Sequence, residues 1–170
     1  MLINAIKNRH SIRNYVEGGI VTDKQIKTLL EAAMLAPSAC NSRPWKFLVI
    51  TKRTKLDEII DVHLFTHMLK TASAAIVVLA DTTLQKDVSE GFFPQDCGAA
   101  TQNILLQAAE MGLGTCWCGV YPKEPIVKQF KEIFNLPNHI VPFCCIALGV
   151  PNEQCDSRGF YEEEKIEWIN

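Results

Sequence analysis

The residues best suited to chemistry lie close to the start of the chain, between Asn8 and Arg13. Two arginines, a histidine and a serine fall within this short segment. Arg9 and Arg13 can each present a rigid fork of N–H donors to phosphate oxygens, and the Ser11 hydroxyl can take a remaining lone pair. The segment therefore suggests an anionic, phosphate-bearing ligand. The alternative is a solvated basic turn, because charged clusters usually lie at the surface.

A second polar cluster, Ala36 to Trp45, directly precedes the apolar run 46–51. It is bounded by Pro37 and Pro44, so it predicts a loop between a helix and a strand. Proline, serine and asparagine are the residues that any turn uses, and composition alone does not separate a functional loop from an ordinary one.

Taken together, the two clusters resemble the opening signatures of the nitroreductase family of flavin mononucleotide (FMN) enzymes. One signature is an Arg-x-Ser-x-Arg/Lys motif, and the other is an Ala-Pro-Ser-x-x-Asn-x-Gln-Pro-Trp motif. This chain carries them on Arg9, Ser11, Arg13, Ala36, Pro37, Ser38, Asn41, Pro44 and Trp45. The resemblance continues through the segments 112–119 and 146–151, so it spans nearly the whole chain.

The resemblance implies that the flavin performs the chemistry while the protein positions it, so no side chain receives a catalytic role. Arg9 and Ser11 would hold the phosphate, and Arg13 would lie near the pyrimidine edge of the ring and tune its potential. The loop from Pro37 would come from the neighbouring subunit, and the backbone near Gly119 would run past the ring. The residues implied to bind the cofactor are Arg9, His10, Ser11, Arg13, Pro37, Ser38, Ala39, Asn41, Trp117, Cys118, Gly119 and Arg158.

Three of these residues keep a simpler alternative. His10 could be a surface imidazole without a ligand. Trp117 could be a core residue, which is the more frequent fate of an indole in an apolar strand. Arg158 could be a tail arginine in solvent, since no regular element is predicted around it.

The implied function is transfer of a hydride from NADH or NADPH to bound FMN. Electrons would then pass to a small acceptor such as a nitroaromatic, quinone or enone, by a ping-pong mechanism. The resemblance also implies a homodimer with FMN at the subunit interface. A flavin-binding sensor or storage protein without efficient turnover is the alternative. The chain has no Gly-x-Gly-x-x-Gly loop from which to choose between NADH and NADPH.

The sequence departs from the family pattern at two places. Arg43 stands where the family more often has glutamine, and it could alter substrate access or pair with an acidic neighbour. Phe65 and Met68 stand where family members often present asparagine or lysine to the flavin. Three nearby polar residues are candidates to replace that contact: His63, His67 and Lys70.

Length and composition bound the alternatives. A chain of 170 residues fits one domain, expected over 1–170 with a C-terminal tail from about 152. The net charge of −2 gives no general reason to bind nucleic acid or an anionic membrane. No apolar run is long enough to span a bilayer, and the first residues lack the pattern of a signal peptide, so we expect a cytoplasmic protein.

Seven cysteines, an odd number, argue against a secreted disulfide scaffold. Cys116, Cys118, Cys144 and Cys145 fall in apolar runs and are expected to be reduced thiols that fill small core volumes. The paired Cys-x-x-Cys spacing of a zinc or iron–sulfur site is missing, so no metal is expected.

Hydrophobic periodicity predicts alternating helices and strands. Thr22 and Gln25 have capping-box spacing at the start of a helix that should end near Ala36. Gly98, Ala99 and Ala100, in a later helix, are expected to be small enough to let another backbone approach closely. Helices are predicted over 22–36, 97–111 and 124–134, with 55–69 mostly helical, and strands over 47–51, 74–80, 115–120 and 142–150. The run 74–80 is continuously apolar and is expected to be a strand buried on both faces. The pattern indicates an α+β or layered α/β domain; the family adds a mixed, largely antiparallel sheet flanked by helices and an intertwined homodimer.

Overall fold

The computed structural model describes residues 2–155 and 161–169. These described residues contain five α-helices and four strands, which alternate from α2 onward. The helices are α1 (Asn4–Asn8), α2 (Asp23–Met34), α3 (Arg53–Val62), α4 (Phe93–Glu110) and α5 (Glu124–Phe134). The strands are β1 (Trp45–Ile50), β2 (Ala74–Asp81), β3 (Gly114–Gly119) and β4 (Ile140–Gly149). Short 3₁₀ helices are η1 (Ala39–Asn41), η2 (Leu64–Lys70), η3 (Thr82–Leu84), η4 (Asp87–Ser89) and η5 (Glu163–Lys165).

The four strands form one sheet in the order β1-β2-β4-β3, with every neighbouring pair antiparallel. A single parallel bridge, between Ser11 and Thr115, extends the sheet beyond β3. The predicted fold class, an α+β arrangement with a largely antiparallel sheet, is confirmed. β2 is buried along its whole length, as its uninterrupted apolar sequence predicted.

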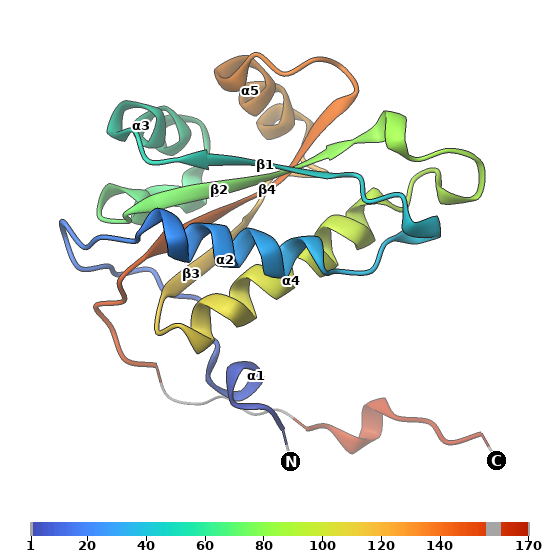
Figure 1. Cartoon of the computed structure of the whole chain (residues 1–170), viewed down its shortest axis with the longest axis horizontal. Helices are drawn as coiled ribbons and strands as arrows, with labels where there is room; N and C mark the ends of the chain where they lie inside the picture. The colour runs from blue at the N-terminus through green and yellow to red at the C-terminus, as the bar shows by residue number, and fades with distance from the viewer. Residues whose placement is uncertain (1, 156–160, 170) are drawn as a thin grey trace.

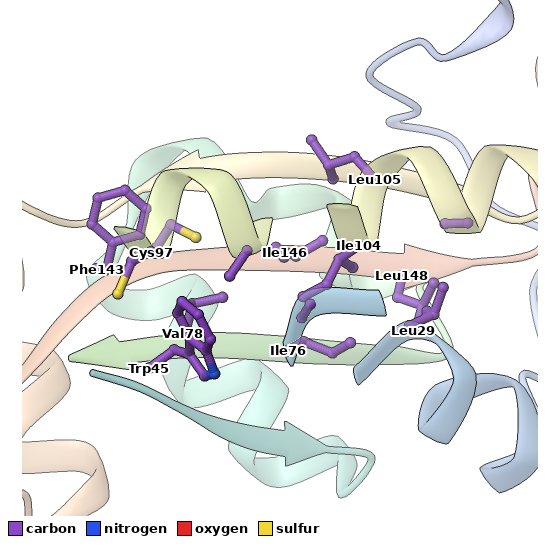
Figure 2. Packing of buried hydrophobic residues seen from close by; sticks show 14 of the residues in the cluster. Leu29, Trp45, Ile76, Val78, Cys97, Ile104, Leu105, Phe143, Ile146 and Leu148 are labelled. Carbon is purple, nitrogen blue, oxygen red and sulfur yellow. The ribbon is translucent and has the colours of Figure 1, made fainter. Parts of the chain in front are cut away.

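Helices cover both faces of the sheet (Figure 1). α2 and α4 pack on one face, where Leu29 and Ile104 meet Ile76 and Ile146 of the two central strands (Figure 2). α3 and α5 cover the opposite face, with Ile59 and Phe130 among the residues packed there. The sheet is thus the middle layer of three. The long helix α4 packs on the same face of the sheet as α2.

α2 begins as the sequence predicts. The Thr22 hydroxyl accepts from the Gln25 backbone N–H, and the Gln25 side chain accepts in return from the Thr22 N–H. The helix ends at Met34, two residues before the predicted boundary, because Pro37 disfavours helical backbone in the residue before it.

Two expectations need adjustment. A Cβ built on Gly98 would meet the side chains of Trp117 and Phe143, both at 3.9 Å, so the expected close approach of a backbone at Gly98 was wrong. The last core strand begins at Ile140, two residues earlier than predicted, with Pro142 inside it. Proline is tolerated there because the register with β2 shifts between Val78 and Leu79, next to its position.

Within 2–155 and 161–169, no helix is both long and apolar enough to cross a membrane.

Candidate functional site

The basic segment at the start of the chain lies beside β3. The Ile12 N–H donates to the Thr115 carbonyl at 2.8 Å, and Ser11 forms the parallel bridge with the same residue. A Cβ on Gly114 would lie 2.9 Å from a methyl group of Ile12, so glycine is what allows the segment to approach the strand. The first signature and the Gly-Leu-Gly-Thr-Cys-Trp-Cys-Gly segment are therefore neighbours in space.

Two hollows follow each other along this edge. The first, of about 200 Å³, is lined by Arg9, His10 and Thr115, together with residues at the end of α4. The second, of about 360 Å³, is lined by Arg13 and by the strand residues from Cys116 onward. Arg9 and His10 therefore line the first hollow, and Arg13 lines the second. This spacing suits a ligand that carries a phosphate at one end and a polar ring at the other.

The outer edge of β3 offers backbone donors to the second hollow. The Val120 N–H donates to the Phe143 carbonyl at 3.1 Å, so Val120 faces β4. Because neighbouring residues of a strand alternate in direction, the N–H and C=O of Trp117 and Gly119 point to the outer edge. A Cβ on Gly119 would meet no heavy atom within 4 Å, which leaves open space beside this peptide.

A carboxylate from the C-terminal part of the chain, that of Glu153, binds the backbone of the basic segment. Glu153 Oε1 accepts from the backbone N–H of Arg13 at 2.5 Å and from that of Asn14 at 3.3 Å. Glu153 also lines the first hollow. The Arg13 guanidinium remains exposed, and one of its nitrogens lies 3.4 Å from the Ser11 carbonyl. The positive charge of Arg13 therefore stays available to a ligand.

Thiols form the inner wall of the second hollow. Cys116 and Cys118 are buried, as expected for cysteines that fill small core volumes. The Cys118 thiol donates to the Phe65 carbonyl at 3.2 Å, so its single hydrogen is taken up by that bond. Burial raises the pKa of Tyr15, whose hydroxyl donates to the Ile12 carbonyl at 2.8 Å.

The second polar cluster forms a tight loop around η1. Cys40, Asn41 and Arg43 all adopt positive φ angles, between 47° and 55°, which is unfavourable for residues other than glycine. The Ser38 hydroxyl accepts from the Arg43 N–H at 3.0 Å, and Asp96 of α4 accepts from the Ala39 N–H at 2.9 Å. Three non-glycine residues with positive φ in one short loop are unusual for an ordinary turn.

The structure does not bring the two clusters together within one chain. The loop is tied to Asp96 near the start of α4, whereas Arg9 and His10 share their hollow with Ala109 and Gly112 at its end. Thirteen residues of helix separate Asp96 from Ala109, which corresponds to about 20 Å. Figure 1 shows the loop after α2 and the segment after α1 at opposite ends of α4.

Comparison with known proteins decides the family. The model of the nitroreductase family matches residues 6–70 and 63–150, which include both polar clusters and the β3 segment. The chain belongs to the nitroreductase family. The resemblance inferred from the sequence motifs is thereby confirmed.

Individual nitroreductase relatives match over most of their length. A protein of Methanothermobacter thermautotrophicus, provisionally named NADH dehydrogenase/NAD(P)H nitroreductase, is 42% identical over 97% of this chain and 85% of its own. The crystal structure of a provisionally named NADH oxidase from Clostridium acetobutylicum has a TM-score of 0.91 and 43% identity, covering 96% of this chain and 98% of its own. A nitroreductase of Desulfovibrio desulfuricans, solved in complex with FMN, has a TM-score of 0.83 and 29% identity, covering 98% and 95%.

The departures from the nitroreductase pattern have visible consequences. The Arg43 guanidinium donates through Nε to the Asn41 amide oxygen at 2.8 Å, so its partner is an amide within the loop and not an acidic neighbour. Phe65 and Met68 both line the second hollow, and so do His63 and His67. Lys70 does not line it. Of the three polar candidates to replace the asparagine or lysine contact with the flavin, only His63 and His67 therefore line the second hollow as described.

Trp117 takes up an intermediate position. Its indole packs edge-on against Phe143 with ring centroids 5.8 Å apart, yet 37% of the residue remains exposed. It is thus neither a fully buried core residue nor free in solvent. Arg158, the remaining residue implied to bind phosphate, lies outside the described residues.

Two polar residues that hold the candidate site, Glu153 and Asp96, were not predicted from the sequence. Glu153 binds the backbone of Arg13 across 140 positions of sequence. Asp96 holds the loop at Ala39 across 57 positions, and its second oxygen accepts from the Gln85 side chain at 2.9 Å. An acidic residue in the first turn of a helix is common because it favours the helix dipole, so Asp96 carried no distinguishing signal.

Proposed function

We propose that this chain is an FMN-dependent NAD(P)H oxidoreductase that passes a hydride on to a small acceptor such as a nitroaromatic, quinone or enone. The observation that carries the proposal is the pair of adjacent hollows along β3, one faced by Arg9 and His10 and the other by Arg13. The FMN complex of the Desulfovibrio desulfuricans neighbour supports this cofactor. The name of the Methanothermobacter relative supports a nicotinamide donor.

The residues present fit FMN. The first hollow offers a guanidinium, an imidazole and the nearby Ser11 to a phosphate, and Arg9 and His10 are half-buried, which strengthens their interaction with an anion. Glu153 adds negative charge to the same hollow, and the positive charge of Arg9 offsets it. The open space beside Gly119 leaves room for a flat ring against the strand edge.

When bound, FMN supplies the hydride chemistry. Arg13 then provides a fixed positive charge beside the pyrimidine end of the ring, where reduction leaves negative charge. The N–H groups of Trp117 and Gly119 supply directed donors along the strand edge. In a ping-pong mechanism, nicotinamide and acceptor would use the same open face in turn.

Dimerisation is part of the proposal. The loop from Pro37 to Asn41 and the basic segment lie at opposite ends of α4, so one chain does not complete the site that the family signatures describe. A two-fold partner would bring the loop of one chain to the basic segment of the other. Each chain would contribute one domain, 1–170, with its C-terminal tail from about 152.

The test begins with the visible spectrum of the purified protein after addition of FMN and gel filtration. We expect a retained flavin band that bleaches rapidly with NADH or NADPH under anaerobic conditions and returns when a quinone is added. A retained flavin that neither donor reduces would favour the sensor or storage alternative. A protein that retains no flavin would overturn the proposed function.

A further inference from the structure

A buried histidine joins the turn after α3 to the end of β3. His63 is only 2% exposed, and both of its ring nitrogens are engaged. Its Nδ1 accepts from the Phe65 N–H at 3.2 Å, so in the neutral ring the hydrogen must reside on Nε2. Nε2 lies 2.8 Å from the Gly119 carbonyl oxygen. His63 therefore donates a hydrogen bond to Gly119.

A second contact links the same two segments. The Cys118 thiol donates to the Phe65 carbonyl at 3.2 Å. The His63 ring also packs edge-on against Phe65 and Phe130, with centroids 6.2 Å away in each case. Two hydrogen bonds, from His63 to Gly119 and from Cys118 to Phe65, hold the start of η2 against the end of β3, while the bond from the Phe65 N–H orients the His63 ring.

Gly119 is the residue of β3 that most needs such support. Glycine has the widest choice of backbone conformation, and a Cβ at this position would meet no neighbour that could restrict it. Its partner on β4, Cys144, is a non-hydrogen-bonded one, because the ladder bonds are made by Val120 with Phe143. The Val120 N–H holds the peptide between Gly119 and Val120 from the β4 side, and the bond from His63 holds the Gly119 carbonyl of the same peptide from the outer side.

We propose that His63 is a positioning residue for the cofactor. By holding the Gly119 carbonyl from the outer side, it secures the end of β3 and so keeps the neighbouring N–H groups of Trp117 and Gly119 in place toward the flavin ring. This role rests on the proposed function, because it assumes that FMN lies against that edge. It assigns to His63 a contact with the protein backbone in place of the direct flavin contact that a polar residue in this region was expected to make.

Two substitutions separate the hydrogen bonds of the ring. In His63→Gln the side-chain amide reaches the place of Nε2 and can still donate to Gly119, whereas in His63→Asn it reaches only the place of Nδ1. We expect His63→Asn to raise the dissociation constant for FMN by about tenfold, because binding must then order the loosened end of β3, and His63→Gln to stay within about threefold of the parent. His139→Asn, at an exposed histidine away from the hollows, is the matched control and should change nothing.

Two measurements do not depend on the flavin. Long-range ¹⁵N correlation spectra of the unaltered protein should show His63 with its hydrogen on Nε2. In flavin-free protein, hydrogen exchange of the Val120 amide should be faster in His63→Asn than in His63→Gln, because the strand end loosens only when the bond to Gly119 is lost.

The outcomes are distinct. A hydrogen on Nδ1 would overturn the role of His63, as would equal FMN affinity in the parent and His63→Asn. Equal losses in the two variants would also overturn it, because they would indicate that only ring packing matters. A parent protein that binds no FMN would overturn the proposed function and the role of His63 together, whereas the first three results leave the proposed function standing.

Discussion

Arg13 places a permanent positive charge at the second hollow, with its guanidinium exposed and its backbone N–H bound by Glu153. A cation there stabilises the reduced, negatively charged flavin more than the neutral oxidised one. Arg13→Gln should therefore lower the two-electron midpoint potential, by about 30 mV for every ~1.4 kcal/mol of stabilisation lost. Equilibration with redox dyes of known potential measures this shift.

Lys7→Gln is the matched control for Arg13→Gln, since Lys7 is an exposed cation on α1 that lines neither hollow. It should leave the potential unchanged. An Arg13→Gln protein with a potential equal to or above that of the parent would show that Arg13 does not face the pyrimidine end of the ring.

Asp81, at the end of β2, makes stability depend on pH. Lys46 Nζ lies 2.7 Å from its carboxylate, and Thr83 donates to it through both N–H and hydroxyl. The Lys46 hydrogen bond, followed by those of Thr83, lowers the pKa of Asp81 to about 2. The unfolded value is about 3.9, so the ionised carboxylate stabilises the fold above that pH. This stabilisation is lost as the pH falls from about 4 towards 2.

Asp81→Asn should consequently lower the free energy of unfolding at pH 6, and its difference from the parent should shrink as the pH falls below about 4. Urea unfolding at several pH values measures this. Asp57→Asn, which breaks the exposed pair with Arg53, should cost less than about 0.5 kcal/mol. A difference between Asp81→Asn and the parent that stays constant down to pH 2.5 would contradict the assignment.

At the scale of elements, the loop around η1 depends on a polar network at the start of α4. One Asp96 oxygen accepts from Ala39 and the other from Gln85, whose own oxygen accepts from the Phe93 N–H at 2.9 Å. In Asp96→Asn the new amide group would face the amide group of Gln85. We expect this substitution to destabilise the fold by about 1–3 kcal/mol, the cost of buried polar groups without partners.

A second substitution in the same network should compensate for the loss caused by Asp96→Asn. Adding Gln85→Glu to Asp96→Asn exchanges donor and acceptor, so all three hydrogen bonds can form again. Thermal unfolding of the single and double variants should show most of the loss recovered. If the double variant is no more stable than Asp96→Asn alone, the hydrogen bond between residues 85 and 96 does not control this loop.

These elements show how far sequence could lead. The capping box at Thr22, the fully buried β2 and the order of helices and strands follow from local spacing and periodicity, and they were predicted. Asp96 and Glu153 were not, because their partners Ala39 and Arg13 are far away in sequence and neither residue stands in a recognisable motif. The contact made by His63 could not be predicted either, since it depends on Gly119, 56 residues away at the end of β3, lying beside the turn after α3.

At the scale of the whole molecule, the two family signatures occupy opposite ends of α4, so the proposed FMN site needs a second chain. The basic segment was predicted to bind FMN together with the loop of a neighbouring subunit. The distance between the two clusters within one chain is in keeping with that prediction, because the loop is anchored at Asp96 near the start of α4 and the first hollow is lined by Gly112 just after its end. Two chains in a two-fold dimer can join what one chain holds apart.

Mixed dimers test this arrangement. One variant carries Arg9→Ala, and the other carries Ser38→Ala with Asn41→Ala, each inactive alone as a homodimer. They are unfolded and refolded together so that chains pair at random. In a mixed dimer one site collects all the lesions and the other is wholly native, so activity should return to about a quarter of that of the refolded parent.

The quarter follows because half of the dimers are then mixed and each contains one intact site. Each variant refolded alone is the control for residual activity, and the refolded parent corrects for the yield of folding. If every site were built from a single chain, each site in a mixed dimer would keep the lesion of its own chain. Refolding the variants together would then restore no activity, and the division of the site between two chains would be wrong even if FMN binds.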